Sequence, residues 1–487
     1  MLFLVKLFPE ITIKSRPVRK RFIRQLRKNL KAVLAPLDEG VKVTGEWDCL
    51  EVEVTASESP AIDLIIERMA STPGISQFAE VDRFDLPDMD GMLELASQYY
   101  AERLTDKTFA VRCKRMGKHA FRSVDVERFV GAGLNQQTKS AGVKLVNPDV
   151  TVALEIRDEF LYVVSKNHQG LGGFPLGCQD AVLSLISGGF DSAVSSYLCI
   201  KRGLQTHYCF FNLGGRAHEL AVKEVALFLW MKFHSSHRVK FVSVPFEGVV
   251  EEILNRIDNA QMGVVLKRMM LRAADKVAQQ LDIKALVTGE SVAQVSSQTL
   301  VNLSVIDGVA ETLVLRPLAT SDKQEIIDTA RAIGTEDFSK HIPEYCAVIS
   351  KNPTTKARLE RIEKEEDRFN FDVLEQSIAS ARIQLITDVV SDIESGSADV
   401  TIVNSVDESS TVIDIRHPNE IDVKPLIIEN NSQETLSIPF YALRTQFDSL
   451  DSSKRYLLYC DHGMMSRLHA AHLVDEGFEN VAVLELK

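Results

Sequence analysis

A short segment near the middle of the chain, Ser187-Gly-Gly-Phe-Asp-Ser192, has the composition of a phosphate-binding loop. The residues before it, Ala181–Ile186, are mostly apolar and typical of a buried strand, and a helix is expected to begin at Asp191-Ser192. Glycine lets a backbone approach a phosphate closely, and a helix N-terminus offers unpaired N–H groups and a positive dipole end. The segment predicts a phosphate cradle, with a plain strand–turn–helix junction as the alternative.

The surrounding sequence indicates which kind of phosphate loop this is. The Gly-Lys-Ser/Thr ending of the Walker loop is missing, and the segment resembles instead the SGGxDS pyrophosphate loop of enzymes that split ATP into AMP and pyrophosphate. Residues from about 178 to 345 alternate strands and helices, which favours a doubly wound parallel sheet with its ligand beyond the strands' carboxyl ends. Gly289 ends another expected strand and is a candidate ligand-binding residue in the same crevice. The alternative is that it is a simple turn glycine. The expected strands are Ala181–Ile186, Thr206–Asn212, Val239–Val244, Ala285–Gly289 and Thr312–Leu315.

A second candidate for chemistry is Cys460, which follows the apolar strand Tyr456–Tyr459. A helix is expected from Ser466-Arg467, so backbone N–H groups would point at the sulfur, and with Arg467 nearby this predicts a lowered thiol pKa that also suits a persulfide. The strand–Cys–loop–helix order resembles the rhodanese active-site loop, and Val412–Glu420 resembles the upstream rhodanese signature. A buried cysteine at a strand end is the alternative.

Composition narrows the class of protein. The chain has 487 residues, which favours three or four domains, and a net charge of −12, so any nucleic-acid surface must be local. No apolar run reaches a membrane span and no secretory signal is evident. Seven cysteines without CxxC pairs argue against a disulfide framework or zinc site and fit the reducing cytoplasm.

Two basic segments are candidate RNA-binding surfaces. Lys14–Lys31 holds nine Lys/Arg and no acid, with Phe22 and Leu26 on one apolar helical face; a solvated face or a transit-peptide-like helix are the alternatives. Phe109–Arg122 carries five Lys/Arg beside His119 and two phenylalanines, which suits RNA and resembles a THUMP domain. The candidate RNA-binding residues are Arg19, Lys20, Arg24, Arg112, Lys114, Arg115 and Lys118.

Together these motifs resemble the tRNA uridine 4-sulfurtransferase (ThiI) family, in its long form with a C-terminal rhodanese domain, over essentially the whole chain. The matching motifs are Ser187–Ser192, Cys209–Gly214, Gln261–Lys267, Val287–Glu290, Gln294–Gln298, Pro343–Cys346, and Cys460 with Gly463 and Ser466-Arg467.

The resemblance implies an α/β multidomain fold. We expect a ferredoxin-like α+β unit over residues 1–74, a THUMP RNA-binding domain over 75–170 and a doubly wound, parallel-sheet pyrophosphate-loop adenylation domain over 178–386. A charged segment from Asn352 to about Ile386 is expected to be helical, and an acidic, serine-rich linker over 387–410 leads to a rhodanese-like α/β domain over 411–487.

The resemblance also implies roles for individual residues. Cys460 matches the persulfide carrier and Cys346 its disulfide partner; from the residues alone, Cys346 beside Pro343 is only a packing cysteine in a loop. Asp191 and Lys323 match positions that matter for activity. No metal-ligating side chains are expected. The implied ATP-binding residues are Leu185, Ile186, Ser187, Gly188, Gly189, Asp191, Ser192, Lys267, Gly289 and Gln298.

The implied activity is ATP-dependent transfer of persulfide sulfur to uridine 8 of tRNA, through an adenylated uridine, with ATP and Mg²⁺. The implied partners are tRNA, a cysteine desulfurase, and a small ubiquitin-like sulfur carrier protein that serves the thiamine thiazole; no membrane partner is expected, and a homodimer is left open. The alternatives are a pyrophosphate-loop tRNA-modifying ligase that does not use sulfur, and a non-catalytic tRNA-binding module. The Cys460 loop speaks against the first and the intact glycine loop against the second.

Overall fold

The computed structural model forms two compact units, Met1–Pro175 and Leu176–Lys487. It describes residues 1–45, 49–56, 59–213, 215–340, 342, 352–389, 400–407, 409–416, 421, 425–426, 428, 435–460, 464–475 and 477–486. Within that described part, no helix is both long and apolar enough to cross a membrane.

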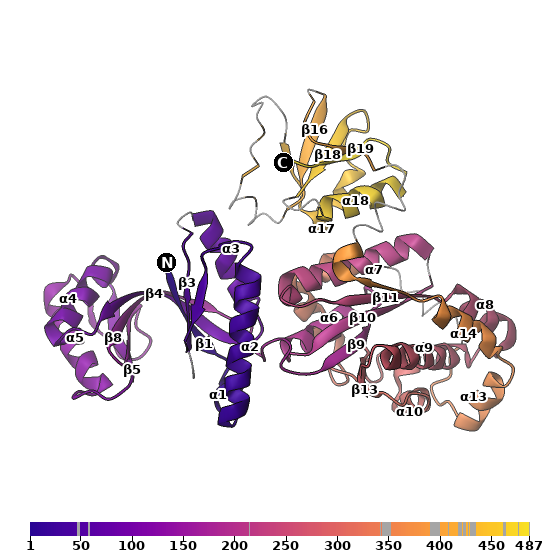
Figure 1. The fold of residues 1–487 in the computed structure, drawn as a ribbon, viewed down its shortest axis with the longest axis horizontal. Coiled ribbons are helices and arrows are strands. Elements are labelled where there is room, and N and C mark those ends of the chain that lie inside the picture. Colours follow the sequence, from indigo (N-terminus) through magenta and orange to yellow (C-terminus); the bar gives the residue numbers. More distant parts are fainter. Residues whose placement is uncertain are drawn as a thin grey trace. The chain divides into compact units, whose positions relative to one another are not determined.

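The first unit is built on one mixed sheet of eight strands, in the order β2-β3-β1-β4-β8-β7-β5-β6 (Figure 1). Its strands are β1 Leu2–Leu7, β2 Lys42–Thr44, β3 Cys49–Glu53, β4 Ile75–Asp85, β5 Thr108–Met116, β6 Gly142–Val143, β7 Val150–Arg157 and β8 Phe160–Gln169. Its α-helices are α1 Pro9–Thr12, α2 Arg16–Leu34, α3 Ser59–Ala70, α4 Met89–Tyr100 and α5 Ser123–Gln137.

The long strand β4 pairs antiparallel with β1 on one side and with β8 on the other. The two domains expected over 1–74 and 75–170 therefore share one sheet. The Tyr100 hydroxyl links the neighbouring strands β7 and β8 of this sheet. It accepts from the Ala153 N–H at 3.2 Å and donates to the Val164 carbonyl.

Helix α2 forms because its apolar residues recur on one face. Phe22, Leu26, Leu30 and Leu34 are buried. The basic side chains between them are mostly exposed, as the periodicity predicts for an amphipathic helix. The helix thus presents cations to solvent and covers the core of the first unit.

The second unit begins with a six-stranded sheet in the order β13-β12-β9-β10-β11-β14. All neighbours pair in parallel except β11 and β14, and this confirms the expected parallel α/β sheet. The strands are β9 Ala181–Leu185, β10 Gln205–Asn212, β11 Lys240–Pro245, β12 Ala285–Val287, β13 Leu313–Leu315 and β14 Arg382–Leu385. The α-helices are α6 Phe190–Lys201, α7 Gly215–Leu229, α8 Glu247–Arg256, α9 Met262–Gln280, α10 Leu300–Asp307, α11 Lys323–Ile333, α12 Glu336–Lys340, α13 Leu359–Glu366 and α14 Phe371–Ala379.

The strand order places a topological switch point beside β9. The chain runs from β9 outward to β10 and β11, and then returns to the other side of β9 as β12 and β13. Ligands of doubly wound sheets bind at such a point, beyond the carboxyl ends of the strands. The loops that follow β9 and β12 therefore lie next to each other, at the place where a ligand is expected.

The expectation of an all-helical segment from Asn352 to Ile386 is wrong at its end. Residues Arg382–Leu385 form β14, antiparallel to Lys240–Ser243 of β11. The run of charges is the surface pattern of α13 and α14, and the last four residues complete the sheet's edge.

The chain ends in a five-stranded parallel sheet, in the order β15-β19-β18-β16-β17. Its elements are β15 Ile402–Val403, β16 Ser410–Asp414, β17 Thr435–Ser437, α17 Phe440–Phe447, β18 Arg455–Tyr459, α18 Met464–Asp475 and β19 Val481–Leu484. Within the span expected as a linker, 387–410, residues 402–403 already belong to this sheet, and 390–399 and 408 lie outside the described residues.

Candidate active site

The glycine loop between β9 and α6 is held closed by one hydroxyl. Ser192 Oγ accepts from the backbone N–H of Ser187 at 3.1 Å and donates to the carbonyl of Gly189 at 3.0 Å. Gly188 has φ +81°, a left-handed conformation that favours glycine. The helix α6 begins at Phe190, so its unpaired N–H groups open onto the loop.

Gly289, just beyond β12, lies directly against this helix start. A Cβ at position 289 would stand 2.6 Å from the carbonyl carbon of Asp191 and 2.8 Å from the Ser192 nitrogen. Both are backbone atoms that cannot rotate away. Only glycine permits this close approach. Because of it, the carboxyl ends of β9 and β12 lie side by side and form one site.

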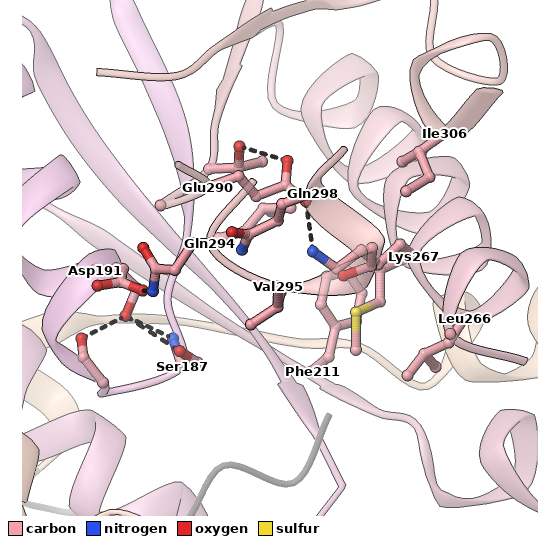
Figure 2. A pocket seen from close by; sticks show the side chains of 18 of the residues that line it. Ser187, Asp191, Phe211, Leu266, Lys267, Glu290, Gln294, Val295, Gln298 and Ile306 are labelled. Atoms are coloured by element: carbon pink, nitrogen blue, oxygen red, sulfur yellow. Dashed lines mark hydrogen bonds and ion pairs between the residues drawn. The ribbon is translucent and has the colours of Figure 1, made fainter. Parts of the chain in front are cut away.

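A cavity of about 490 Å³ opens at this point (Figure 2). Every residue expected to bind ATP lines it except Gly188, whose carbonyl instead accepts from Ser339 Oγ at 2.9 Å. The expected residues that line the cavity are Leu185, Ile186, Ser187, Gly189, Asp191, Ser192, Lys267, Gly289 and Gln298.

A chain of alternating charges begins at Lys267 and Glu290, which line the cavity, and extends to two residues outside its lining, Arg316 and Asp307. Lys267 Nζ donates to Glu290 Oε1 at 2.6 Å, Arg316 Nε donates to Glu290 Oε2 at 2.9 Å, and Arg316 continues to Asp307 at 2.8 Å. Burial raises the pKa of Glu290, but Lys267 and Arg316 outweigh it and the pKa lies below its ordinary value. Glu290 therefore stays ionised and holds the Lys267 ammonium at the cavity.

A second charged group stands at the phosphate loop. The carboxylate of Asp191 accepts from Lys323 Nζ on Oδ1 at 2.7 Å and from Gln294 Nε2 on Oδ2 at 2.8 Å. The structure thus brings together Asp191 and Lys323, which are 132 positions apart in the sequence. Figure 2 shows Asp191 and Gln294 facing one another beside Ser187.

The rest of the cavity wall is largely apolar, with one buried acceptor. Phe211, Leu266 and Ile306 line it, and Gln298 is 8 % exposed. Gln298 Oε1 accepts no hydrogen bond from any residue that the structure describes. An apolar slot with an unused acceptor suits a flat heterocycle that carries an amino group, such as adenine.

Cys460 follows β18 directly and is half-buried. Its Sγ lies 3.4 Å from the backbone nitrogen of Ser466, which donates to it, and 3.4 Å from the Ser466 hydroxyl. Both groups sit in the first turn of α18, where the helix dipole favours negative charge. Arg467, expected to act on the thiol, has its Nε bonded to Glu485 at 2.6 Å.

The other described cysteines are buried. Burial raises the pKa of the Cys199 and Cys209 thiols to about 12, and burial with Glu127 nearby does the same for Cys113. Cys346 and the residues around it lie outside the described part of the chain. Among the cysteines that the structure describes, Cys460 alone is partly exposed rather than buried.

The candidate RNA-binding residues lie on two elements of the first unit. Lys20 and Arg24 are exposed on α2, whereas Arg19 donates to the Thr12 carbonyl at 3.1 Å. On β5, Arg112 and Lys114 alternate with buried Val111 and Cys113 and so point to the exposed face.

The turn after β5 holds the side chain of Arg115 in place. Arg115 donates to the Gly117 carbonyl at 3.0 Å and lies 3.0 Å from His119 Nδ1. Lys118 in the same turn is exposed. His119 stacks on Phe121, with 5.4 Å between ring centroids, so the turn presents cations beside an aromatic pair.

The sequence did not identify Glu290, Gln294 and His218, which line the cavity, as site residues. It also did not identify Arg316 and Asp307, which extend the ion pair of Glu290. Glu290 and Gln294 fall inside segments that were noted only as motifs. His218 lines the cavity. Burial lowers the pKa of its imidazole, and this effect outweighs a hydrogen bond with the Ser187 backbone that raises it. No local pattern identifies these residues, because their partners lie far away in the sequence.

Comparison with known proteins identifies three regions of the chain. Residues 177–371 match the family model of the thiamine biosynthesis protein (ThiI), residues 87–166 match the THUMP domain, and residues 2–79 match the ThiI ferredoxin-like domain. The chain is 54 % identical to the tRNA sulfurtransferases of Azotobacter vinelandii and Colwellia psychrerythraea, over 99 % of each chain.

A solved structure supports the same conclusion. The crystal structure of a 4-thiouridine synthetase–RNA complex with bound ATP matches with a TM-score of 0.68 and 26 % identity, covering 79 % of this chain and 99 % of that one. With full-length identity above one half to the curated relatives, the chain belongs to the tRNA sulfurtransferase (ThiI) family of enzymes.

Proposed function

We propose that this enzyme transfers sulfur from a persulfide on Cys460 to C4 of a tRNA uridine, position 8, after ATP has activated O4. The observation that carries the proposal is that one chain joins a cavity with a glycine phosphate loop to a cysteine whose sulfur receives an N–H from a helix start. The similarity to a 4-thiouridine synthetase with ATP and RNA supports the choice of substrates.

In the first step, uracil O4 attacks the α-phosphorus of ATP and pyrophosphate leaves. The glycine loop and the start of α6 would hold the phosphates, and Lys267 and Gln298 the nucleoside. Asp191 and Lys323 would act in this step, beside the phosphates. If Mg²⁺ is bound, Asp191 fits as its carboxylate ligand together with phosphate oxygens, and the ion would neutralise phosphate charge. The described residues contain no cluster of three or more His, Cys, Asp or Glu side chains that could hold a metal ion.

In the second step, the terminal sulfur of the Cys460 persulfide attacks C4 and AMP leaves, which joins Cys460 Sγ to the base through a disulfide. The Cys346 thiolate then attacks Cys460 Sγ. The Cys346–Cys460 disulfide forms, the S–S bond to the base breaks, and its electron pair stays on the new 4-thio group. A dithiol reductant resets the two cysteines. The domain order supports a rhodanese-like role for residues 411–487.

The persulfide requires a donor, for which a cysteine desulfurase is the chemical class that fits. A second acceptor is a small ubiquitin-like carrier protein that takes the Cys460 sulfur toward the thiamine thiazole. The match of residues 177–371 to a model described as a thiamine biosynthesis protein supports this additional role.

The test is a reconstitution of the full chain with tRNA, ATP, Mg²⁺, L-cysteine and a desulfurase, followed by mass analysis of the nucleosides. Cys460→Ala is expected to form no 4-thiouridine while retaining tRNA-dependent exchange of pyrophosphate into ATP. Cys113→Ala, which changes a buried thiol, is the control and should keep both activities. Full thiolation by Cys460→Ala would overturn the sulfur role. Exchange without any sulfur product in the wild type would favour the ligase, and neither activity would favour the binding module.

The resetting step has its own test. After one turnover without reductant, peptide mapping of the wild type is expected to find a Cys346–Cys460 disulfide, and excess dithiol should restore activity. Cys346→Ala should support at most a reduced or single-turnover reaction. If Cys460 stays a free thiol or pairs with Cys209, then Cys346 is a packing residue.

A further inference from the structure

The loop that follows β12 contains a left-handed residue that is not glycine. Ala293 has φ +66°, a conformation that costs energy for any residue with a Cβ. Two backbone hydrogen bonds hold it there: Val292 N–H donates to the Ala319 carbonyl at 3.0 Å and Ala293 N–H to the Gln298 carbonyl at 3.0 Å. Strained backbone of this kind collects at functional sites, where the surroundings enforce it.

The residue that this bend presents is Gln294, which lines the cavity. Its Nε2 lies 2.8 Å from Asp191 Oδ2, and its Oε1 is shielded from solvent and accepts no hydrogen bond from the described residues. The amide can only face the carboxylate with its N–H end, because Oε1 would repel the carboxylate oxygen. Figure 2 shows the two side chains directed toward each other.

Asp191 therefore has a different donor on each oxygen: the Lys323 ammonium on Oδ1 and the Gln294 amide on Oδ2. Lys323 is a cation on a flexible stem whose side chain is 42 % exposed. The phosphates of ATP will compete with Asp191 for that ammonium. A neutral amide is attracted far less by phosphate, so it can keep the carboxylate in place when Lys323 moves.

We propose that Gln294 is a positioning residue for the adenylation step, which holds the Asp191 carboxylate in its working orientation while Lys323 is shared with the phosphates. The inference rests on the role of Asp191 in the proposed function. A purely structural role fits less well. The bend is maintained by the backbone bonds of Val292 and Ala293, so truncation of the Gln294 side chain leaves its frame intact.

The test compares Gln294→Ala with Asp191→Asn and with the double variant. The readouts are kcat for tRNA-dependent pyrophosphate exchange and the Kd of a fluorescent ATP analogue. Gln294→Ala is expected to lower kcat by about 10- to 100-fold, the scale of a misplaced group, with Kd changed less than about threefold. In the Asp191→Asn background, Gln294→Ala should cause no further loss, because the carboxylate that it positions is no longer there.

Gln324→Ala is the matched control. Gln324 Nε2 also donates to a carboxylate, Asp328 Oδ1, at 2.9 Å, but on the exposed face of α11. It should leave kcat and Kd unchanged. Gln294→Glu should be worse than Gln294→Ala, since it sets a carboxylate against Asp191 and competes for Lys323.

Three results would overturn the inference: normal kcat in Gln294→Ala, losses that multiply in the double variant, or a rise in Kd as large as the fall in kcat. The last would assign Gln294 Oε1 to direct contact with the nucleotide. If Asp191→Asn itself keeps full exchange, the assigned role of Asp191 fails. If Asp191→Asn is inactive but Gln294→Ala is normal, only the role of Gln294 fails.

Discussion

The ammonium of Lys267 and the carboxylate of Glu290 lie 2.6 Å apart at the wall of the cavity, and Arg316 shares the same carboxylate. Removal of the Glu290 charge would leave two cations facing each other in a largely buried site. We expect Glu290→Gln to destabilise the second unit by about 2–3 kcal/mol, less than a fully buried pair because Lys267 is partly exposed. It should also weaken ATP binding, because Lys267 loses its anchor.

Urea unfolding and ATP titration test this, with the exposed Glu251→Gln as control. The pKa of Glu290 lies below its ordinary value of 4.5, so its stabilisation is present above that pH and is lost as pH falls through the folded-state pKa. Wild type and Glu290→Gln should therefore converge in strongly acidic solution. Equal stability of the two at pH 7 would contradict the argument.

Gly289→Ala should abolish nucleotide binding. The added Cβ would meet the Asp191 carbonyl carbon at 2.6 Å, and that backbone can move only with the start of α6 and the phosphate loop. Overpacking of this kind costs about 1–3 kcal/mol, and the displaced loop should reduce pyrophosphate exchange by at least about 100-fold.

Gly248→Ala is the matched control for that variant. Its Cβ would meet only Val373 Cγ1, at an ordinary 3.5 Å, within helix α8. We expect unchanged ATP affinity and a gain of about 0.5–1 kcal/mol in stability. Normal ATP affinity in Gly289→Ala would show that the helix start is not part of the nucleotide site.

Elements of the fold could be predicted where the residues that determine them lie close together in the sequence. The apolar run at Ala181–Leu185, the two glycines and the helix start lie within a dozen positions, and β9 and α6 follow that pattern. In contrast, Arg382–Leu385 becomes a strand only because β11 offers it an open edge. The sheet shared by the first two expected domains likewise depends on the long-range pairing of β4 with β8.

The site divides in the same way. Ser187, Asp191 and Gly289 stand at strand ends, where topology alone predicts a ligand. Gln294 and Asp191 are 103 positions apart, and Arg316 reaches Glu290 across 26. Such pairs are created by tertiary packing, and neither glutamine nor arginine in these segments carries a spacing that would reveal its partner.

The stability of the second unit should depend on pH through a buried histidine. Burial, with Lys240 nearby, lowers the pKa of His207 to about 4, and its Nδ1 accepts from the Lys240 N–H at 3.0 Å. In the unfolded chain His207 binds a proton below about pH 6.5, whereas in the folded state it binds one only below about pH 4. Stability should therefore fall as pH drops through this range, by at most about 3 kcal/mol from this residue.

His207→Asn isolates the effect, because an Asn Oδ1 can accept the same N–H without titrating. Urea midpoints can be followed by Trp230 fluorescence in a Trp47→Phe background, since the chain has two tryptophans. The difference between the two curves cancels the contribution of His218, whose pKa is also lowered by burial. A difference that stays constant from pH 7 to 4 would show that His207 is not the titrating group.

Helix α2 is expected to bind tRNA through phosphate contacts. Arg21, Arg24 and Lys28 are exposed on it, within an acid-free run of nine cations on a chain of net charge −12. Each phosphate contact contributes about 0.7–0.9 to the slope of log K against log salt concentration. Reversal of these three charges to Glu should lower tRNA affinity and flatten that slope by roughly two, while the Kd for ATP stays the same.

The control reverses three exposed lysines of the second unit, Lys276, Lys284 and Lys364, and so changes the net charge by the same amount. If α2 is a local contact surface, only its own reversal should flatten the salt slope, because screening limits each charge to about 10 Å at 0.1 M salt. Equal losses in both triple variants would assign the effect to net charge. An unchanged slope in the α2 variant would make its basic face an ordinary solvated surface and would leave β5, with Arg112 and Lys114, as the RNA contact of the first unit.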